Sequence, residues 1–307
     1  MKSYKAVIEL KSPLATPMMG DTVFGHVCWG IVRRRGEEEL DKFLSGCAGS
    51  EPPHFAVSSA FPHGRLPRPL MKQSEQTDKS LAVYSQRKEL KAKKYIPADL
   101  ILDNKKIEPA ALEEALRKEP VRFTSAEVRT RNTINRVTGT TGDEGSLFPT
   151  TETHYHQPLA DLYIVADCSG DEVSQYLDWA FEFGFGADAS VGMGQIGRIR
   201  LEEIELPRDG KWGMSLGPFI PSYRDSDELE ELSYEIFVRY GKLGGGSAAS
   251  TNPFKKPLVM FTEGSTFIPK EKKETVGTLI GGVHSDPRIR HSGIAPVVYF
   301  DVSEEVL

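Results

Sequence analysis

The chain has 307 residues, of which 39% are hydrophobic and 27% charged, a composition that is ordinary for a folded protein and excludes wholesale disorder. No apolar run approaches the roughly 18 residues of a membrane span, and the N-terminus carries no small-residue cleavage site, so we expect neither a membrane anchor nor a signal peptide. Cys28, Cys47 and Cys168 lie far apart without CxxC spacing, which predicts no disulfide framework, no zinc site and a cytoplasmic location.

The charge is unevenly distributed along the chain. The formal net charge of −6 argues against a uniformly basic nucleic-acid binder. Residues 65–136, however, contain 17 Lys and Arg against 10 Asp and Glu, while the remaining residues contain 21 against 34. This polarity is compatible with solvated helices and loops. It also fits a local site for a polyanion beside acidic surfaces that face other proteins.

The first half of the chain alternates strands and helices. Apolar and polar residues alternate over 5–11, which predicts a strand, and a helix begins at Gly20 with Asp21 as its N-cap. Further strands are predicted over 55–61, 159–166 and 198–205, and helices over 80–94, 109–118 and 171–183. Residues 129–148 predict a hairpin that turns at Gly139, Gly142 and Gly145.

This order of elements, β-α-β, insertion, β-α-β, is that of the ferredoxin-like fold. A boundary at 207–211 divides the chain into a domain over 1–206, with an insertion at about 65–155, and a domain over 207–307. Strands predicted over 214–220, 234–241, 258–262, 277–283 and 294–300 indicate a second, degenerate unit. The predicted fold class is therefore α+β: two ferredoxin-like (RRM-like) units, with antiparallel sheets and helices on one face.

Five glycines lie between residues 184 and 197, between a predicted helix and a predicted strand. Such a loop lets the backbone approach a ligand and present N–H groups, for which a phosphate backbone is a natural partner. The glycines follow the helix instead of opening it, and no Gly-Lys-Ser/Thr is present, which excludes dinucleotide and Walker motifs. The alternative is a glycine-rich turn packed against a neighbouring sheet. The candidate contacts in the loop are Gly186, Ser190, Gly192 and Gly194.

The start of the first helix is a second candidate anion site. Gly20, Asp21 and Thr22 place free N–H groups and a partial positive charge at one chain end. A possible anion site at the start of this helix favours a ligand-binding role for the glycine loop over a purely packing role.

With these features together, the sequence resembles the RAMP superfamily of CRISPR proteins, in which a glycine-rich loop follows the second helix of a ferredoxin-like fold. Within that superfamily it resembles the family of fourth subunits of type III-A Csm effector complexes. The segments that carry the resemblance are 20–25 with Trp29, 60–69, 131–139, 183–197, 240–245, 254–257 with 264–265, and 286–293. They cover almost the whole chain in the expected order.

The resemblance implies a non-catalytic role in antiviral defence, with no cofactor or metal. It implies that the chain binds the repeat-derived 5′ handle of CRISPR RNA (crRNA). The implied protein partners are the large polymerase-like subunit and the first backbone RAMP subunit of a hetero-oligomeric ribonucleoprotein. It also implies a thumb-like hairpin that displaces a nucleotide, for which residues 129–148 or the nearby insertion are the candidates.

One departure from the family pattern concerns charge in the glycine loop. Related loops often carry Lys or Arg among the glycines, whereas this chain has Ala187 and Met193 there. Backbone N–H groups then have to supply more of the contact, and Arg198, just beyond the loop, is a candidate substitute for the missing charge.

The predicted hairpin contributes the remaining candidates for RNA contact, which are Arg129, Arg131, Asn132, Asn135 and Arg136. Arginine binds phosphate with a fork of donors, and asparagine reads base edges. Alternation places Arg129 and Arg131 on one face of a strand. The alternative is a solvated strand with incidental charge.

Histidines suggest two further possibilities. His26 lies one turn into the first helix, where some RAMP nucleases place a general base, although a packing role is the more common one for such a residue. His154 and His156 point to the same side of a strand and would suit base stacking or, with a third ligand that the sequence does not reveal, a metal. The alternative functions are therefore a metal-independent endoribonuclease that processes CRISPR RNA, and a pure protein scaffold.

Overall fold

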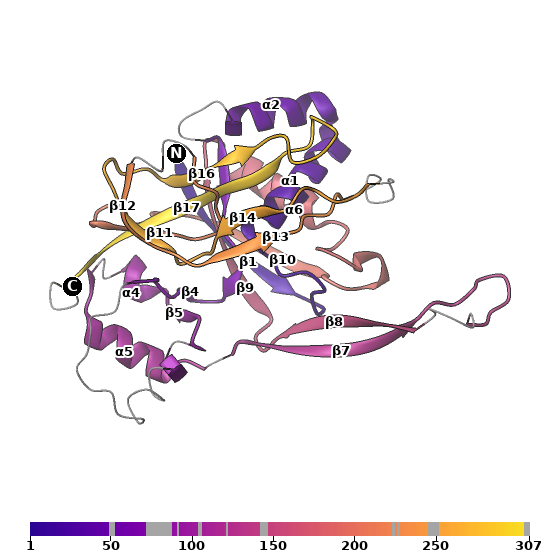
Figure 1. The fold of residues 1–307 in the computed structure, drawn as a ribbon, viewed down its shortest axis with the longest axis horizontal. Helices are drawn as coiled ribbons and strands as arrows, with labels where there is room; N and C mark the ends of the chain where they lie inside the picture. The colour runs from indigo at the N-terminus through magenta and orange to yellow at the C-terminus, as the bar shows by residue number, and fades with distance from the viewer. Residues whose placement is uncertain are drawn as a thin grey trace.

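The computed structural model describes residues 1–48, 53–71, 88–90, 92–103, 106–120, 122–141, 147–222, 225, 228–244 and 252–303. Two largely antiparallel sheets form the body of the molecule, and a long hairpin projects from it (Figure 1). Within the described residues, no helix is both long enough and apolar enough to cross a membrane.

The first sheet is antiparallel and has the strand order β10–β1–β9–β2, with β3 also paired to β9. Its strands are β1 (Lys2–Leu10), β2 (Phe55–Val57), β3 (Phe61–Pro62), β9 (Leu159–Ala166) and β10 (Ile196–Ile204). The helices α1 (Gly20–Arg35) and α6 (Gly170–Phe181) pack on one face of this sheet, and α2 (Glu37–Ala48) packs on α1.

Side-chain alternation explains how this sheet forms. Tyr4, Ala6 and Ile8 are buried on the helix-covered face of β1, where they meet the apolar side of α1. The Ser169 hydroxyl caps α6 by accepting a hydrogen bond from the Glu172 N–H at 3.2 Å. On the opposite face of the sheet, Tyr163 belongs to a second core that it shares with the second half of the chain.

The second sheet has the strand order β12–β15–β11–β17–β16. Its strands are β11 (Trp212–Ser215), β12 (Leu229–Ser233), β15 (Thr266–Pro269), β16 (Thr275–Ile280) and β17 (His291–Val302). The strands β13 (Ile236–Arg239) and β14 (Leu258–Phe261) pair separately. Of the described residues in 207–303, only Asp225 and Glu228 are helical, so the helices predicted on one face of a second unit are not found there.

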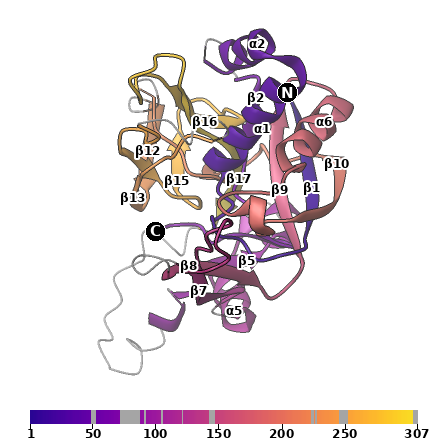
Figure 2. The same ribbon diagram turned by 90° about the vertical axis from the view of Figure 1, so that its right-hand side faces the viewer.

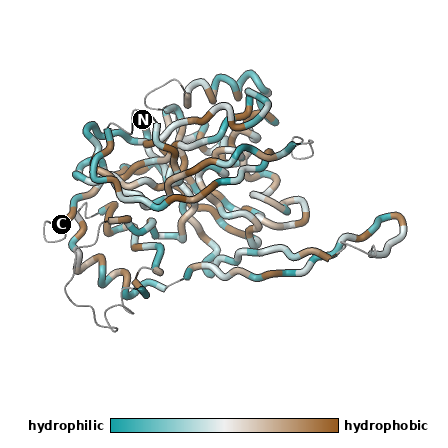
Figure 3. The backbone as a smooth tube through the Cα atoms, viewed as in Figure 1, coloured by the Kyte–Doolittle hydropathy of each residue, from teal (hydrophilic) through white to brown (hydrophobic). Residues whose placement is uncertain are grey.

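The insertion packs beneath the second sheet and then extends into the hairpin (Figure 1). Its body contains β4 (Arg65–Pro67), β5 (Tyr95–Pro97), α4 (Asp99–Leu102), β6 (Lys106–Ile107) and α5 (Pro109–Lys118), with β6 paired to β17. The hairpin strands are β7 (Thr124–Asn132) and β8 (Leu147–Tyr155). Figure 3 shows hydrophobic residues along this projection; the exposed ones are Val128, Ile134, Val137, Leu147 and Phe148.

Most predicted elements of the first half are confirmed, with shifted ends. The strands over 5–11, 159–166 and 198–205 and the helices over 109–118 and 171–183 correspond to β1, β9, β10, α5 and α6. The strand predicted over 55–61 is split into β2 and β3, and the hairpin strands begin earlier and end later than 129–148. The helix predicted over 80–94 lies mostly outside the described residues, as do Gly142 and Gly145. The elements that were not predicted are α2, β4, β5, α4, β6, β12 and β15.

A buried ion pair joins the first helix to the second half of the chain, whose strands lie beside α1 in Figure 2. Asp21 Oδ2 is 2.7 Å from Arg239 Nε of β13 and 3.4 Å from His291 Nε2 of β17. Burial by itself would raise the pKa of Asp21, but the contacts with His291 and Arg239 more than offset it and hold the pKa below its usual range. The carboxylate is thus charged, buried and paired.

We expect Asp21→Asn to lower the free energy of unfolding by about 3 kcal/mol at neutral pH, because Arg239 would lose its carboxylate in a largely buried setting. The folded-state pKa of Asp21 is lowered, so its contribution is present above about pH 4 and is lost as the pH falls through the folded-state value. Urea unfolding at neutral and acidic pH measures both effects.

The matched control for this prediction is Asp286→Asn, which removes a carboxylate whose ion pair with Arg288 lies at the surface. We expect the control variant to remain nearly as stable as the wild type. Equal stabilities of the Asp21 and Asp286 variants would contradict a structural role for the buried pair.

Candidate functional site

Three segments that are distant in sequence meet beside the base of the hairpin. They are the β1–α1 connection (residues 11–19), the glycine loop (residues 183–197) and strand β8. Leu14 exchanges backbone hydrogen bonds with Thr153 of β8 at 2.9 and 2.8 Å. On its other side, the Pro13 carbonyl accepts from the Gly194 N–H at 2.8 Å. The β1–α1 connection therefore lies between the hairpin and the glycine loop.

The backbone N–H groups of the glycine loop are mostly used inside the protein. Phe185 N–H donates to the Gly194 carbonyl at 2.8 Å, and Ala187 N–H donates to Thr16 Oγ1 at 3.0 Å. The other loop residues whose N–H groups donate internally are Gly184, Gly186, Val191, Gly192, Met193, Gly194 and Gln195. A phosphate could bind these N–H groups only by displacing the partners that they have within the protein.

Two of the predicted loop contacts have a packing role. A Cβ at Gly194, where φ is +61°, would lie 2.0 Å from the Phe185 carbonyl oxygen, and a Cβ at Gly186 would lie 2.7 Å from Thr16 Cβ. Ser190, in the short 3₁₀ helix Ala189–Val191, and Gly192 are exposed. A Cβ at Gly192 would meet no atom within 4 Å, although φ is +92° there. Ser190 and Gly192, which we call the loop apex, remain available to a ligand.

His26 fastens the glycine loop to the helix layer. Its Nδ1 lies 3.2 Å from the Ala180 carbonyl, its Nε2 accepts the Gly186 N–H at 3.2 Å, and its ring stacks on Phe185 at 4.6 Å between centroids. Nδ1 is therefore the protonated nitrogen of a neutral ring. Burial lowers the pKa of His26, which favours this neutral form. Both ring nitrogens are engaged, so the structure supports the packing role.

The start of α1 differs from the predicted anion site. The helix begins at Gly20 after Met19, so Asp21 is not its N-cap. The Gly20 N–H donates to Ser59 Oγ at 3.3 Å, and the Thr22 N–H donates to the Met19 carbonyl at 3.0 Å. Because the Asp21 carboxylate and Arg239 occupy this end of the helix, a second anion would meet an existing negative charge.

The hairpin base holds a buried carboxylate with several basic neighbours. Glu152 Oε1 is 3.0 Å from Arg131 Nη2, and Glu152 Oε2 is 3.6 Å from Arg129 Nε and 3.8 Å from His154 Nε2. Arg131 also reaches Asp188 of the glycine loop at 3.7 Å. Arg129 and Arg131 do share a face, as predicted, but that face is directed at Glu152. Both arginines are therefore already paired with Glu152, and a phosphate would have to compete with this carboxylate for them.

The tip of the hairpin carries the predicted residues that stay accessible. Asn132, Asn135 and Arg136 are exposed. Asn135 Oδ1 accepts the Val137 N–H at 2.9 Å, which holds the local turn. Among the described residues Arg136 has no ion-pair partner. Asn132 and Arg136 are consequently the hairpin residues that remain candidates for RNA contact.

The two strand histidines do not form a pair. His154 lies in β8 near Glu127 and Glu152, whereas His156 follows the strand and its N–H donates to the Phe123 carbonyl at 3.0 Å. In the described ranges no group of three His, Cys, Asp or Glu residues is arranged to hold a metal ion.

Arg198 lies on the face of β10 that the helices do not cover. Sequence analysis missed three residues near it, Arg200, Lys11 and His63, which line a groove together with Arg198. The signal for Arg200 was present, since Arg198 and Arg200 alternate on a predicted strand and so share a face. Lys11 and His63 come from distant segments, and no local pattern connects them.

No protein-family profile matches the sequence, and no curated protein matches it. Among solved structures, the chain is similar to one in the Csm3–Csm4 subcomplex of the type III-A CRISPR–Cas interference complex, with 13% identity, a TM-score of 0.59 and coverage of 96% of this chain and 99% of that one. It is also similar to a chain of the Csm1–Csm4 cassette in complex with pppApA, with 14% identity, a TM-score of 0.56 and coverage of 98% and 99%.

At sequence identities of 13% and 14%, these two matches establish a shared fold. Csm4 is the component that the two assemblies have in common, and both matches extend over nearly the full length of both chains. The chain is thus Csm4-like in its fold, which agrees with the family that the sequence motifs indicated.

We expect Gly194→Ala to lower the free energy of unfolding by about 2 to 4 kcal/mol, because the new Cβ would collide with the Phe185 carbonyl at a positive φ. Gly192→Ala is the matched variant, since it has the same backbone strain but open space, and it should cost about 1 kcal/mol. Chemical denaturation compares the two. Similar losses in both variants would show that the close contact at Gly194 is unimportant.

We expect His26→Gln to destabilise the protein by about 1 to 2 kcal/mol near neutral pH, through the loss of hydrogen bonds to Ala180 and Gly186. Because burial lowers the folded-state pKa of His26, protonation favours the unfolded chain, and wild-type stability should fall as the pH drops below about 6.5. The variant should lose stability less steeply over that range. Unfolding measured across this pH range tests the slope, and an equally steep decline in the variant would contradict the prediction.

Proposed function

We propose that the chain is a non-catalytic, RNA-binding subunit of a type III-A CRISPR effector complex. In this role it binds the repeat-derived 5′ handle of crRNA and links the large polymerase-like subunit to the backbone RAMP subunits. The observation that carries the proposal is the similarity in fold, over nearly the whole chain, to chains solved in two assemblies that share Csm4, one with Csm1 and one with Csm3.

The topology of the first sheet supports a RAMP assignment. Along the chain its four main strands are β1, β2, β9 and β10, and their spatial order is fourth, first, third, second, with α1 and α6 on one face. This order supports the proposal that the first half is a ferredoxin-like unit. The projecting β7–β8 hairpin is the candidate for the family's thumb.

Two surfaces support RNA contact. The hairpin presents Arg136 and Asn132 with exposed Ile134 and Val137, a combination of phosphate-binding and apolar side chains that suits an unstacked nucleotide. The glycine loop and the hairpin base are connected through the Asp188–Arg131 pair. An RNA strand at the hairpin base would therefore lie near both.

The endoribonuclease alternative is less well supported. It would use His26 as a general base, but both ring nitrogens of His26 are engaged within the protein. The internal hydrogen bonds of the glycine loop would also suit a pure protein scaffold. A scaffold, however, gives no role to exposed Arg136 and Asn132 on the hairpin.

The experiment that tests the proposal is co-expression of the tagged chain with a type III-A complex, followed by purification and sequencing of the bound RNA. We expect reads that share a repeat-derived 5′ end, and partner subunits in stoichiometric amounts. Purified subunits without RNA would favour a scaffold. Cleavage of repeat RNA by the isolated chain, abolished by His26→Ala, would favour the nuclease.

We expect Arg136→Ala to weaken RNA binding and to reduce the slope of log affinity against log salt concentration by about 0.7, the value for one phosphate contact on a single strand. Arg288→Ala is the matched control, because Arg288 is exposed and paired with Asp286 on another part of the surface. Fluorescence anisotropy with handle RNA over a salt series measures the slope. An unchanged slope in the Arg136 variant would exclude a phosphate contact at the hairpin tip.

A further inference from the structure

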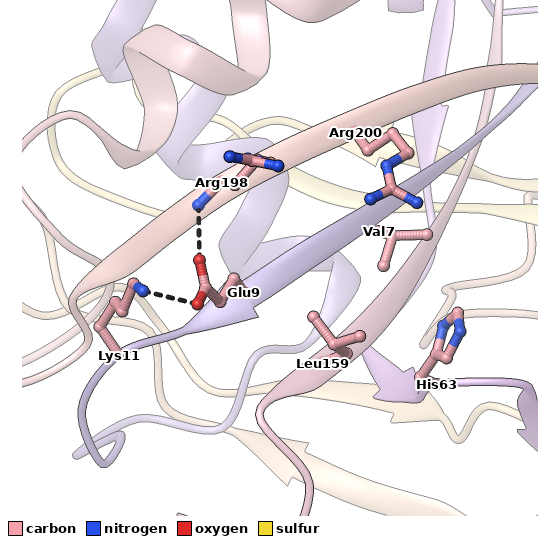
Figure 4. A pocket seen from close by; sticks show the side chains of 7 residues that line it. All are labelled: Val7, Glu9, Lys11, His63, Leu159, Arg198 and Arg200. Carbon is pink, nitrogen blue, oxygen red and sulfur yellow. Dashed lines mark hydrogen bonds and ion pairs between the residues drawn. The ribbon is translucent and has the colours of Figure 1, made fainter.

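A basic groove of about 460 Å³ lies on the face of the first sheet that α1 and α6 leave uncovered (Figure 4). Its lining residues are Val7, Glu9, Lys11, His63, Leu159, Arg198 and Arg200. They come from β1, the β1–α1 connection, the turn after β3, β9 and β10, so the groove exists only in the folded chain.

The register of the sheet explains this lining. Val7 is opposite Arg200 on β10 and opposite Asp161 on β9, so the three residues form one row across the sheet. Successive side chains on a strand point to opposite faces, which places Val7 on the face away from buried Ile8 and the helices. Closer to Tyr163 this face is covered by the second core, whereas the end near Leu159 stays open.

The charges in the groove leave two arginines uncompensated. Glu9 is the only acidic lining residue, and its carboxylate is bound to Lys11 Nζ at 2.5 Å and to the Arg198 backbone N–H at 3.2 Å. The hydrogen bond from Lys11 keeps the pKa of Glu9 below its usual value, so this pair is neutral overall. The guanidinium groups of Arg198 and Arg200 are exposed and have no ion-pair partner among the described residues.

The floor and far wall of the groove are suited to a nucleotide. Val7 and Leu159 form an aliphatic floor between the arginines and His63 (Figure 4). His63 is held in place by Asp161 Oδ1, 2.7 Å from its Nδ1, while Lys5 lies 3.3 Å from Asp161 Oδ2. Because Asp161 is fully buried and satisfied by these partners, it orients the His63 ring without adding a free negative charge to the groove.

We infer that this groove binds the phosphodiester backbone of single-stranded RNA, with Arg198 and Arg200 each contacting a phosphate. Two arginines separated by one residue on a strand lie about 6.6 Å apart and form a line along the groove, which fits successive phosphates of an extended strand better than a single compact anion. Leu159 begins the strand that follows the hairpin, so the Leu159 end of the groove is only a few residues along the chain from the hairpin base.

The inference rests on the proposed RNA-binding function and adds a second contact region to the hairpin. A free nucleotide offers the same phosphate chemistry, so the experiment includes it as a competitor. The probe is a fluorescein-labelled oligouridylate, titrated with the full chain over a salt series, alone and with millimolar ATP.

We expect the double variant Arg198→Ala, Arg200→Ala to bind the oligouridylate about 10-fold or more weakly than wild type near 0.1 M salt, with a salt slope reduced by about 1.4 for two lost contacts. Its melting temperature should be unchanged, because both side chains are exposed and neither has an ion-pair partner within the part of the chain that the structure describes. Arg34→Ala, on α1 at the opposite face of the sheet, is the control and should bind normally.

The possible outcomes distinguish a failure of the proposed RNA-binding function from a failure of the groove inference. If wild type binds no RNA, the proposed function fails. If wild type binds RNA and Arg136→Ala weakens it while the groove variant does not, the function stands and the groove inference is overturned. If ATP binds wild type but not the double variant, and RNA binding is the same in both, the occupant is a free nucleotide, which also overturns the inference.

Discussion

Buried carboxylates decide which basic residues of this protein are available to bind anything else. Asp21, Glu152 and Asp161 are each almost fully removed from solvent. A buried charge is tolerated only when it is paired and hydrogen-bonded. The partners are therefore committed: Arg239 and His291 to Asp21, Arg129, Arg131 and His154 to Glu152, and Lys5 and His63 to Asp161.

The three carboxylates also define the architecture. Asp21 joins the first helix to strands of the second half, Glu152 joins the two strands of the hairpin, and Asp161 joins the centre of the first sheet to the turn after β3. Once these pairs are formed, the cations that remain uncommitted at the hairpin tip and in the groove are Arg136, Arg198 and Arg200. Both proposed RNA contact regions contain arginines that have no ion-pair partner among the described residues.

The glycine loop illustrates how one sequence feature serves two purposes. Gly186 lets the loop approach Thr16 of the β1–α1 connection, and Gly194 lets it approach the Phe185 backbone of the same loop, more closely than a side chain would permit. Ser190 and Gly192 form an apex that is exposed to solvent. The loop therefore has a structural role, while its exposed end is available to a ligand. The neutral ring of His26 holds the loop in place by accepting the Gly186 N–H.

The sequence by itself determined the main strands and helices of the first half and the mixed α and β composition of the fold, because alternation over β1 and β9 and the helical spacing in α1 and α6 are local consequences of one buried face. It also indicated the family, through motifs spread along the chain. It did not reveal that Arg131 is paired, that Asp21 lies beside Arg239, or that Lys11, His63 and Arg200 share a groove. Those facts depend on contacts between residues far apart in the chain, and they were decided by strand register and by the requirement that buried charges find partners, which only the tertiary structure settles.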